Sequence, residues 1–131
     1  MTHTSKRQLF AALALGALTL CGPSAHAQDF PTKPVRILTP FPVGSGPEGV
    51  LRLVADKLSR TWGKPVVVEN KPGGNGFIAI DTFKRGATDG HDLIQLDSVH
   101  LSAYPHLFKK LPYDIKADFE PLAPLFKTYF F

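Results

Sequence analysis

The sequence contains little cysteine and no concentrated charge. Cys21 is the only cysteine among 131 residues, which excludes an internal disulfide and a cysteine-based zinc cluster. The formal net charge is +4, but no run of lysine and arginine exceeds two residues, so the chain lacks the basic patch typical of nucleic-acid binding. With 44% hydrophobic and 20% charged residues, the composition fits neither a disordered polar tract nor a bundle of membrane helices.

The long hydrophobic stretch of a membrane-spanning helix is also missing. The apolar run from Leu9 to Leu20 is shorter than the roughly 20 residues that cross a bilayer. It follows Lys6 and Arg7 and leads to Ala25-His26-Ala27, which is the layout of a secretory signal peptide. We therefore predict that residues 1–27 direct export and are removed by cleavage, which would leave 13 basic and 11 acidic side chains.

A second interpretation of the N-terminus stays open. The segment Leu18 to Cys21 is similar to a lipoprotein box, in which a lipid attached to the cysteine holds the protein at a membrane. Leu20 stands where a small residue is usual. We therefore expect cleavage without a lipid, and a lipid anchor at Cys21 is the alternative.

After the N-terminus, short apolar runs alternate with amphipathic segments. Three runs that are rich in branched side chains predict strands, at residues 35–39, 66–68 and 93–96. Between them, apolar side chains at three- and four-residue steps predict two helices. The first helix is expected from near Pro47 to Gly63, and the second from Phe77 to about Gly86.

This order of elements predicts an α/β fold. Strand, helix, strand, helix, strand at this spacing indicates right-handed crossovers and a mostly parallel sheet with helices on both faces. We expect residues 97–106 to form a loop or short helix that Pro105 ends, and Leu122–Phe131 to form a strand that enters a core. Ligands of such sheets bind in the loops after the strands, which here are residues 40–49, 70–76 and 96–102.

The first of these loops contains a glycine-rich motif. Gly44 to Gly49 fits the pattern G-x-G-x-x-G, and Glu69 follows 20 residues later, as in dinucleotide-binding enzymes. However, four residues separate the strand from the motif, and Pro47 and Glu48 would obstruct a pyrophosphate. A dinucleotide-binding enzyme is therefore only an alternative, and we expect no cofactor. The glycines and the helix start would still attract a carboxylate, while Glu48 is expected to cap the helix.

Four stretches of the chain resemble one family, the Bug periplasmic solute-binding receptors of tripartite tricarboxylate transporters. They follow the family's order through nearly all of the chain after residue 27, at Phe30–Leu58, Gly63–Asp81, Ala87–Leu96 and Leu107–Leu125. The motifs VVVENKPGGNG, at residues 66–76, and KLPYD, at residues 110–114, are specific, and a chance match to both is not expected.

The resemblance implies a fold and a function. Family members are not enzymes; they bind a small carboxylate between two α/β domains that close on it, and they deliver it to transmembrane permease subunits. Residues 28–131 are then expected to be the N-terminal part of such a protein, a domain 1 truncated near the crossover between the domains, and the full-length protein is expected to be a monomer in the periplasm. The alternative function is a periplasmic ligand sensor that feeds a signalling system.

The resemblance also implies which residues bind the ligand. In the family the first loop gives amides and bridging waters to a ligand carboxylate, and here that loop contains Phe41, Pro42, Val43, Gly44, Ser45 and Gly46. The other two loops contribute Asn75, Asp97, Ser98 and His100. Val43 and Ser45 depart from the family's Pro-Phe-x-Pro-Gly-Gly pattern, and Ser45 offers a hydroxyl donor.

Asp97 lies in a loop where the family usually has small or hydroxylated residues. An acid there would repel a carboxylate unless His100 or the ligand itself balances the charge. As a hypothesis, the ligand carries a cationic or hydrogen-bond-donating group as well as a carboxylate. The alternative is that Asp97 only caps the helix that follows it.

Other chemistry has less support in the sequence. The spacings of His91, His100 and His106 match no metal-ligand motif, so we expect structural roles for them and no metal. Ser45 and Ser98 lack the G-x-S-x-G elbow of a nucleophilic serine, which argues against a hydrolase. Two acid–base pairs at i,i+4 spacing are expected on solvated helix faces, namely Asp56 with Arg60 and Asp81 with Arg85.

Overall fold

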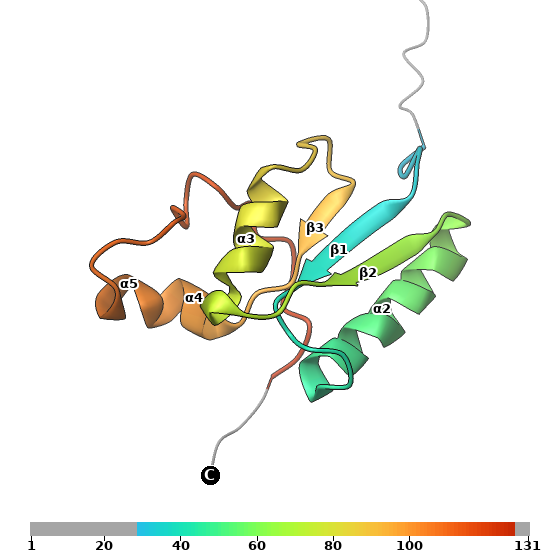
Figure 1. Ribbon diagram of the computed structural model, residues 1–131. Coiled ribbons are helices and arrows are strands. Elements are labelled where there is room, and N and C mark those ends of the chain that lie inside the picture. Colours follow the sequence, from blue (N-terminus) through green and yellow to red (C-terminus); the bar gives the residue numbers. More distant parts are fainter. Residues whose placement is uncertain (1–28, 128–131) are drawn as a thin grey trace, which may run out of the picture.

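A three-stranded parallel sheet is the centre of the protein (Figure 1). The structure is a computed structural model that describes residues 29–127. Strands β1 (Val35–Thr39), β2 (Val66–Asn70) and β3 (Asp92–Ile94) lie in the order β2-β1-β3. Val35 is level with Val66, and Arg36 with Asp92. The predicted α/β fold with a parallel sheet is confirmed, and the carboxyl ends of all three strands meet at one edge.

Helix α2 (Gly46–Trp62) covers one face of this sheet. Leu51 and Ala55 on the helix pack with Val35 and Ile37 of β1, and all four are buried. Pro47 lies in the first turn, where its missing N–H costs no hydrogen bond. Gly63 follows the last turn with φ 63°, a left-handed conformation that ends helices and favours glycine. The predicted limits of this helix are confirmed.

Helix α3 (Phe77–Lys84) packs against β3 and β1. It connects β2 to β3, and the order β2-β1-β3 makes this crossover run opposite to the one through α2. Because both crossovers are right-handed, the two helices must cover opposite faces, and Figure 1 shows them on the two sides of the sheet. Leu38 and Ile80 are fully buried on this side.

The segment after β3 forms two short helices and a long irregular stretch. These are α4 (Ser98–Ser102) and α5 (Tyr104–Leu107). The aromatic ring of Phe77 meets those of Tyr104 and Phe108 edge to face, with centroids 5.9 and 5.4 Å apart. Tyr113 joins this group and is buried. Aromatic packing therefore holds the segment from α5 to Tyr113 against the start of α3.

Four predictions about the limits of elements need correction. Strand β2 continues to Asn70 instead of ending at residue 68. Strand β3 begins at Asp92 and ends at Ile94, before the side chain of Gln95 turns into a hydrogen bond with Thr39. Helix α3 ends at residue 84, short of Gly86. Pro105 does not end a helix but lies in the first turn of α5, where a proline is tolerated because first-turn amides have no helical partner.

The prediction of a strand at residues 122–131 is wrong over 122–127, where the structure has no strand. Leu122 is 74% exposed and Phe126 44% exposed, so this segment does not enter a core. Pro121 and Pro124 lack the N–H that a strand ladder needs, which explains why apolar composition alone was misleading. Residues 128–131 lie outside the described part, as do the predicted signal peptide and Cys21.

Between residues 29 and 127, none of the helices has the length and apolar character that crossing a membrane requires.

Candidate functional site

The predicted ligand loops lie together at the carboxyl edge of the sheet. Two buried polar side chains, Thr39 and Gln95, connect the first of these loops to the third. The Thr39 hydroxyl, at the end of β1, donates to Gln95 Oε1 at 2.8 Å, and Gln95 Nε2 donates to the carbonyl of Pro47 at 3.1 Å. Sequence reasoning missed both residues. The only indication in the sequence was that each polar residue stands directly at the end of an apolar strand run.

The first loop, residues 40–45, uses its own polar groups to hold its shape. The Ser45 N–H and hydroxyl both donate to the carbonyl of Pro42, at 3.2 and 2.9 Å. Gly44 has φ 82°, which places it in the left-handed region. Val43 at the tip is 72% exposed. The hydroxyl that Ser45 was expected to offer a ligand is therefore engaged within the loop.

Glu48 fixes this loop from inside α2. Its carboxylate is 2% exposed and accepts from the Gly44 N–H at 3.2 Å and from the Arg52 guanidinium. Burial raises the pKa of Glu48, but the hydrogen bonds from Gly44 and Arg52 outweigh it and keep the pKa below its usual range. Glu48 thus satisfies an amide at the helix start, as expected, and the Gly44 N–H is already bonded.

Arg52 and Asn70 extend this anchoring to the second strand. Arg52 Nη2 donates to Asn70 Oδ1 at 3.0 Å, and Asn70 Nδ2 donates to the carbonyl of Phe41 at 2.9 Å. The first loop is therefore held to the end of β2 as well as to its own helix. Phe41 is half-buried, whereas Pro42 and Gly46 are exposed.

The second loop, residues 71–76, ends in four successive residues with positive φ. Gly73, Gly74 and Gly76 have φ 107°, 55° and 83°, and Asn75 between them has φ 55°. Within residues 29–127, Asn75 is the only residue other than glycine with positive φ. This turn includes the short helix η1 (Gly74–Gly76). Glycine and asparagine are the residues that adopt positive φ most readily, which explains why this turn is built from them.

The third loop leads into α4 and places Asp97 at its N-cap. Asp97 Oδ1 accepts from the Val99 N–H at 3.1 Å and from the Ser98 hydroxyl at 3.2 Å. The capping interpretation of Asp97 is confirmed, and contact between its carboxylate and a ligand stays a prediction. Ser98 is exposed at the same edge.

His100 has a different place from the other predicted site residues. The residue is only 4% exposed, and its Nδ1 and Nε2 lie 3.1 and 3.0 Å from the backbone carbonyl oxygens of Asp97 and Asn75. Contact between His100 and a ligand stays a prediction; in the structure the residue lies on α4, and its ring contacts the backbone of the second loop. Of the other histidines, His91 is buried and His106 is exposed.

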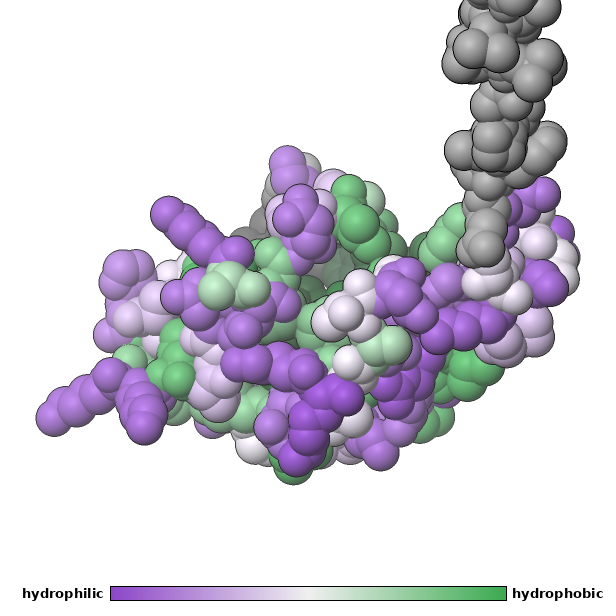
Figure 2. Space-filling model, turned by 90° about the horizontal axis from the view of Figure 1, so that it is seen from above, coloured by the Kyte–Doolittle hydropathy of each residue, from purple (hydrophilic) through white to green (hydrophobic). Residues whose placement is uncertain are grey.

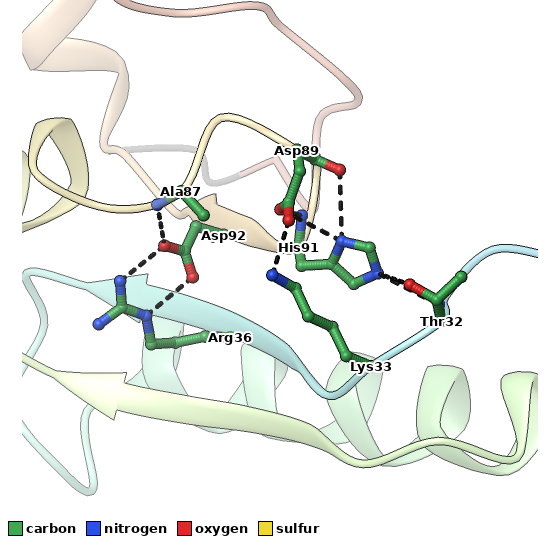
Figure 3. A network of polar contacts seen from close by, with 7 residues as sticks. All are labelled: Thr32, Lys33, Arg36, Ala87, Asp89, His91 and Asp92. Carbon is green, nitrogen blue, oxygen red and sulfur yellow. Dashed lines mark hydrogen bonds and ion pairs between the residues drawn. The ribbon is translucent and has the colours of Figure 1, made fainter.

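A separate polar network lies at the opposite edge, where β1 and β3 begin (Figure 3). Lys33 Nζ is 2.6 Å from Asp89 Oδ2, and His91 Nδ1 is 3.2 Å from Asp89 Oδ1. The hydrogen bond from Lys33 is the largest cause that lowers the pKa of Asp89 from 3.8 to about 2. His91 Nε2 accepts from the Thr32 N–H at 3.2 Å, so this network holds the segment before β1.

Arg36 and Asp92 form the other half of Figure 3. Arg36 Nε and Nη2 donate to the two carboxylate oxygens of Asp92 at 2.9 and 2.7 Å. The Ala87 N–H also donates to Asp92, at 2.8 Å. In the described part of the chain, no three histidine, acidic or cysteine side chains converge as a metal site would require.

Among the surface hollows of residues 29–127 are two that none of the predicted ligand residues lines. One of about 530 Å³ lies beside α3, between Phe77 and Leu111, and one of about 230 Å³ lies between α2 and β2. Figure 2 shows a mostly hydrophilic rim around a central hollow with hydrophobic side chains. The expected i,i+4 ion pairs Asp56–Arg60 and Asp81–Arg85 are confirmed on exposed helix faces.

Comparison with known proteins relates this geometry to a family. Residues 50–130 match the family described as "Tripartite tricarboxylate transporter family receptor". A UPF0065 protein of Bordetella bronchiseptica is 37% identical over 113 residues, covering 86% of this chain and 34% of that protein. The protein BugT of Bordetella pertussis is 32% identical over 98 residues, and the match covers 74% of this chain and 30% of BugT. The chain thus spans about a third of the length of these curated relatives.

Solved structures agree with this likeness. R. palustris Rpa4515 with adipate superposes with a TM-score of 0.61 at 28% identity, covering 66% of this chain and 29% of that chain. A periplasmic transporter superposes with a TM-score of 0.58 at 34% identity, covering 65% of this chain and 29% of the other. The described fold is therefore that of one part of a periplasmic binding protein.

Proposed function

Because the chain belongs to the family of tripartite tricarboxylate transporter receptors, we propose that the protein captures a small carboxylate in the periplasm and delivers it to the membrane subunits of a transporter. The observation that supports this most is the meeting of three strand-end loops at one edge of the sheet, the place where parallel sheets bind ligands. The likeness to a structure with bound adipate, a dicarboxylate, favours a carboxylate as the ligand.

The proposed contacts are the exposed parts of the three loops. Phe41 to Gly46 surround the ligand carboxylate from the first loop, at the positive end of the α2 dipole. Asn75 and Ser98 approach it from the other two loops. The protein acts as a receptor without catalysis and without a cofactor. This proposal assigns residues 1–27 to a signal peptide and residues 28–131 to part of the first domain, in a protein that acts as a monomer.

Domain closure completes the proposed mechanism. The matched region covers only 34% and 30% of the two relatives, and we assign the other half of the pocket to a second domain. Closure of two domains over the ligand would remove water from its carboxylate, which strengthens hydrogen bonds from loop amides. The closed shape would then be the one that the transporter recognises.

Gly46 offers a sharp test of the carboxylate site. A Cβ atom at Gly46 meets nothing within 4 Å, and the residue begins α2, where an acid suits the helix dipole. Gly46→Glu should therefore preserve folding while its charge repels a bound carboxylate, and Gly46→Gln is the matched neutral control. In the protein expressed from its complete gene, we expect calorimetric titration with adipate and related carboxylates to show binding that weakens about tenfold or more in Gly46→Glu alone.

Two results would contradict the proposed function. One is the absence of heat and of any rise in melting temperature with every carboxylate of the series. The other is unchanged affinity in Gly46→Glu, which would place the ligand away from this loop.

A further inference from the structure

A chain of three hydrogen bonds passes through the buried side chains of Thr39 and Gln95. The Phe41 N–H donates to the Thr39 hydroxyl oxygen at 3.3 Å, the Thr39 hydroxyl donates to Gln95 Oε1 at 2.8 Å, and Gln95 Nε2 donates to the Pro47 carbonyl at 3.1 Å. Phe41 lies near the start of the first ligand loop, and Pro47 lies directly after it. The chain of bonds therefore joins the two ends of this loop through the residue that precedes the third loop.

Only one order of donors and acceptors completes this chain. The Pro47 carbonyl can only accept and the Phe41 N–H can only donate. Gln95 must therefore direct its nitrogen to Pro47 and its oxygen to Thr39. The Thr39 hydroxyl then has to donate to Gln95 and accept from Phe41. Apolar side chains of similar volume would fill the same space, but they would make none of these bonds.

The three strands fix where these side chains begin. Thr39 is the last residue of β1, and the Gln95 N–H donates to the Leu38 carbonyl at 2.8 Å, which holds the residue after β3 against β1. At the end of β2, Asn70 Nδ2 donates to the Phe41 carbonyl at 2.9 Å. Each strand is thus followed or ended by a side chain that holds the first loop. Thr39 is fully buried and Gln95 is 5% exposed, so water competes little for their bonds.

We propose that Thr39 and Gln95 are positioning residues of the carboxylate site, which hold the first ligand loop in its binding conformation beside the third loop before a ligand arrives. This inference rests on the proposed function. Ordering a loop in advance removes part of the entropy cost of binding. Both side chains are buried and bond to loop backbone, so they act on the ligand through the loop and not by touching it.

Two substitutions of Thr39 separate positioning from packing. Thr39→Val keeps the shape of the side chain and removes the hydroxyl, whereas Thr39→Ser keeps the hydroxyl and removes a methyl group. In the protein expressed from its complete gene, calorimetric titration with adipate should show about tenfold weaker binding in Thr39→Val and nearly wild-type binding in Thr39→Ser. Thr61→Val removes a hydroxyl that bonds to the Lys57 carbonyl on an exposed face of α2, and should bind like wild type.

Thermal unfolding of each variant verifies that it is folded at the temperature of the titration. If Thr39 served packing alone, the cavity in Thr39→Ser should weaken binding more than the valine substitution does. That order of affinities would contradict the proposal.

A double substitution tests whether the two residues act as one chain. Gln95→Leu should weaken adipate binding about as much as Thr39→Val, because either change interrupts the same bonds. The variant with both changes should then bind no more weakly than the weaker single variant. Losses that multiply, to about a hundredfold, would mean that the two side chains act independently and would overturn the chain.

The chain is also tested without any ligand. In the ¹⁵N-labelled protein, the side-chain amide signal of Gln95 is identified by its loss in Gln95→Leu. We expect this signal to shift and to exchange faster with solvent in Thr39→Val, and to stay near its wild-type values in Thr39→Ser. A Gln95 signal that is the same in wild type and Thr39→Val would overturn the chain. If adipate does not bind to wild type, the proposed function fails for this ligand, while the Gln95 signal still decides the chain.

Discussion

Single residues at the carboxyl edge of the sheet divide into those that build the loops and those left to meet a ligand. Glu48, Asn70 and Gln95 use their side chains to hold loop backbone in place. Phe41 to Gly46 contribute mainly backbone, and the Gly44 and Ser45 amides are already bonded. Under the proposed function, the ligand would therefore bind to the remaining amides of the first loop and to side chains of the second and third loops.

Asp97 tests what kind of carboxylate the protein prefers. Its Oδ1 caps α4, and asparagine is an equally good N-cap residue, so Asp97→Asn should leave the melting temperature nearly unchanged. If the ligand carries an amine as the sequence suggests, wild type should bind 2-aminoadipate more tightly than adipate, and Asp97→Asn should remove that preference. Calorimetric titration of both compounds against both proteins measures it.

The preference for an amine has a simple counter-result. Equal affinities of wild type for the two compounds, or unchanged affinity after Asp97→Ala, would leave Asp97 as a capping residue only. The alanine variant should still lose about 1 kcal/mol of stability, since it removes the cap.

At the scale of elements, the second loop and α4 depend on each other. Gly76 and Gly44 both have φ near 80°, but an added Cβ atom would clash only at Gly76, where it would meet the His100 ring. Comparing alanine substitutions at Gly44 and Gly76 therefore separates the free-energy cost of the left-handed backbone from the cost of the clash with His100. The short helix η1 therefore packs against His100 of α4 in this way only because its last residue, Gly76, has no side chain.

Substitution of the two glycines should therefore have unequal effects. Gly44→Ala should cost about 1–2 kcal/mol because of the left-handed backbone alone. Gly76→Ala should cost a further 1–3 kcal/mol or so, because the added methyl group displaces His100. Urea unfolding measures both values, and equal losses would mean that the loop and the ring are not in contact.

Elements were predictable from the sequence where their signals are local. Proline at the start and glycine at the end defined α2, and branched apolar runs defined β1 and β2. The contact of His100 with Asn75 joins residues 25 positions apart and depends on how two loops approach each other, which no local pattern contains. The resemblance indicated the right loops, but it could not show that several of their donors are already in use.

On the scale of the whole molecule, stability depends on carboxylates that stay charged. Five carboxyls in the described part have pKa values below their usual range, and for four of them a hydrogen bond from a basic side chain is the largest lowering cause: Glu69, Asp89, Asp92 and Asp118. A lowered folded-state pKa stabilises the fold above the pKa of the unfolded chain, and this stabilisation is lost as the pH falls. Acid should therefore weaken the whole fold.

Lys33→Met isolates the share of Asp89 in this acid sensitivity. With a folded pKa of about 2 against 3.8, the contribution of Asp89 should be complete above about pH 4 and decline toward pH 2. We expect wild type to be more stable than Lys33→Met at pH 5 and the difference to vanish near pH 2 in thermal unfolding. Lys57→Met, on an exposed face of α2, should follow wild type, and a difference that is constant with pH would exclude the Asp89 pair as its cause.

Arg36 lies in the middle strand and reaches acids on both neighbours, Asp92 on β3 and Glu69 on β2. Side chains alternate between the faces of a strand, so a slip of one residue would turn this guanidinium into the apolar layer beside Leu51 and Ala55. The ion pairs of Arg36 therefore favour one register of the three strands and disfavour registers shifted by one residue. The favoured register is the one that places the three ligand loops side by side.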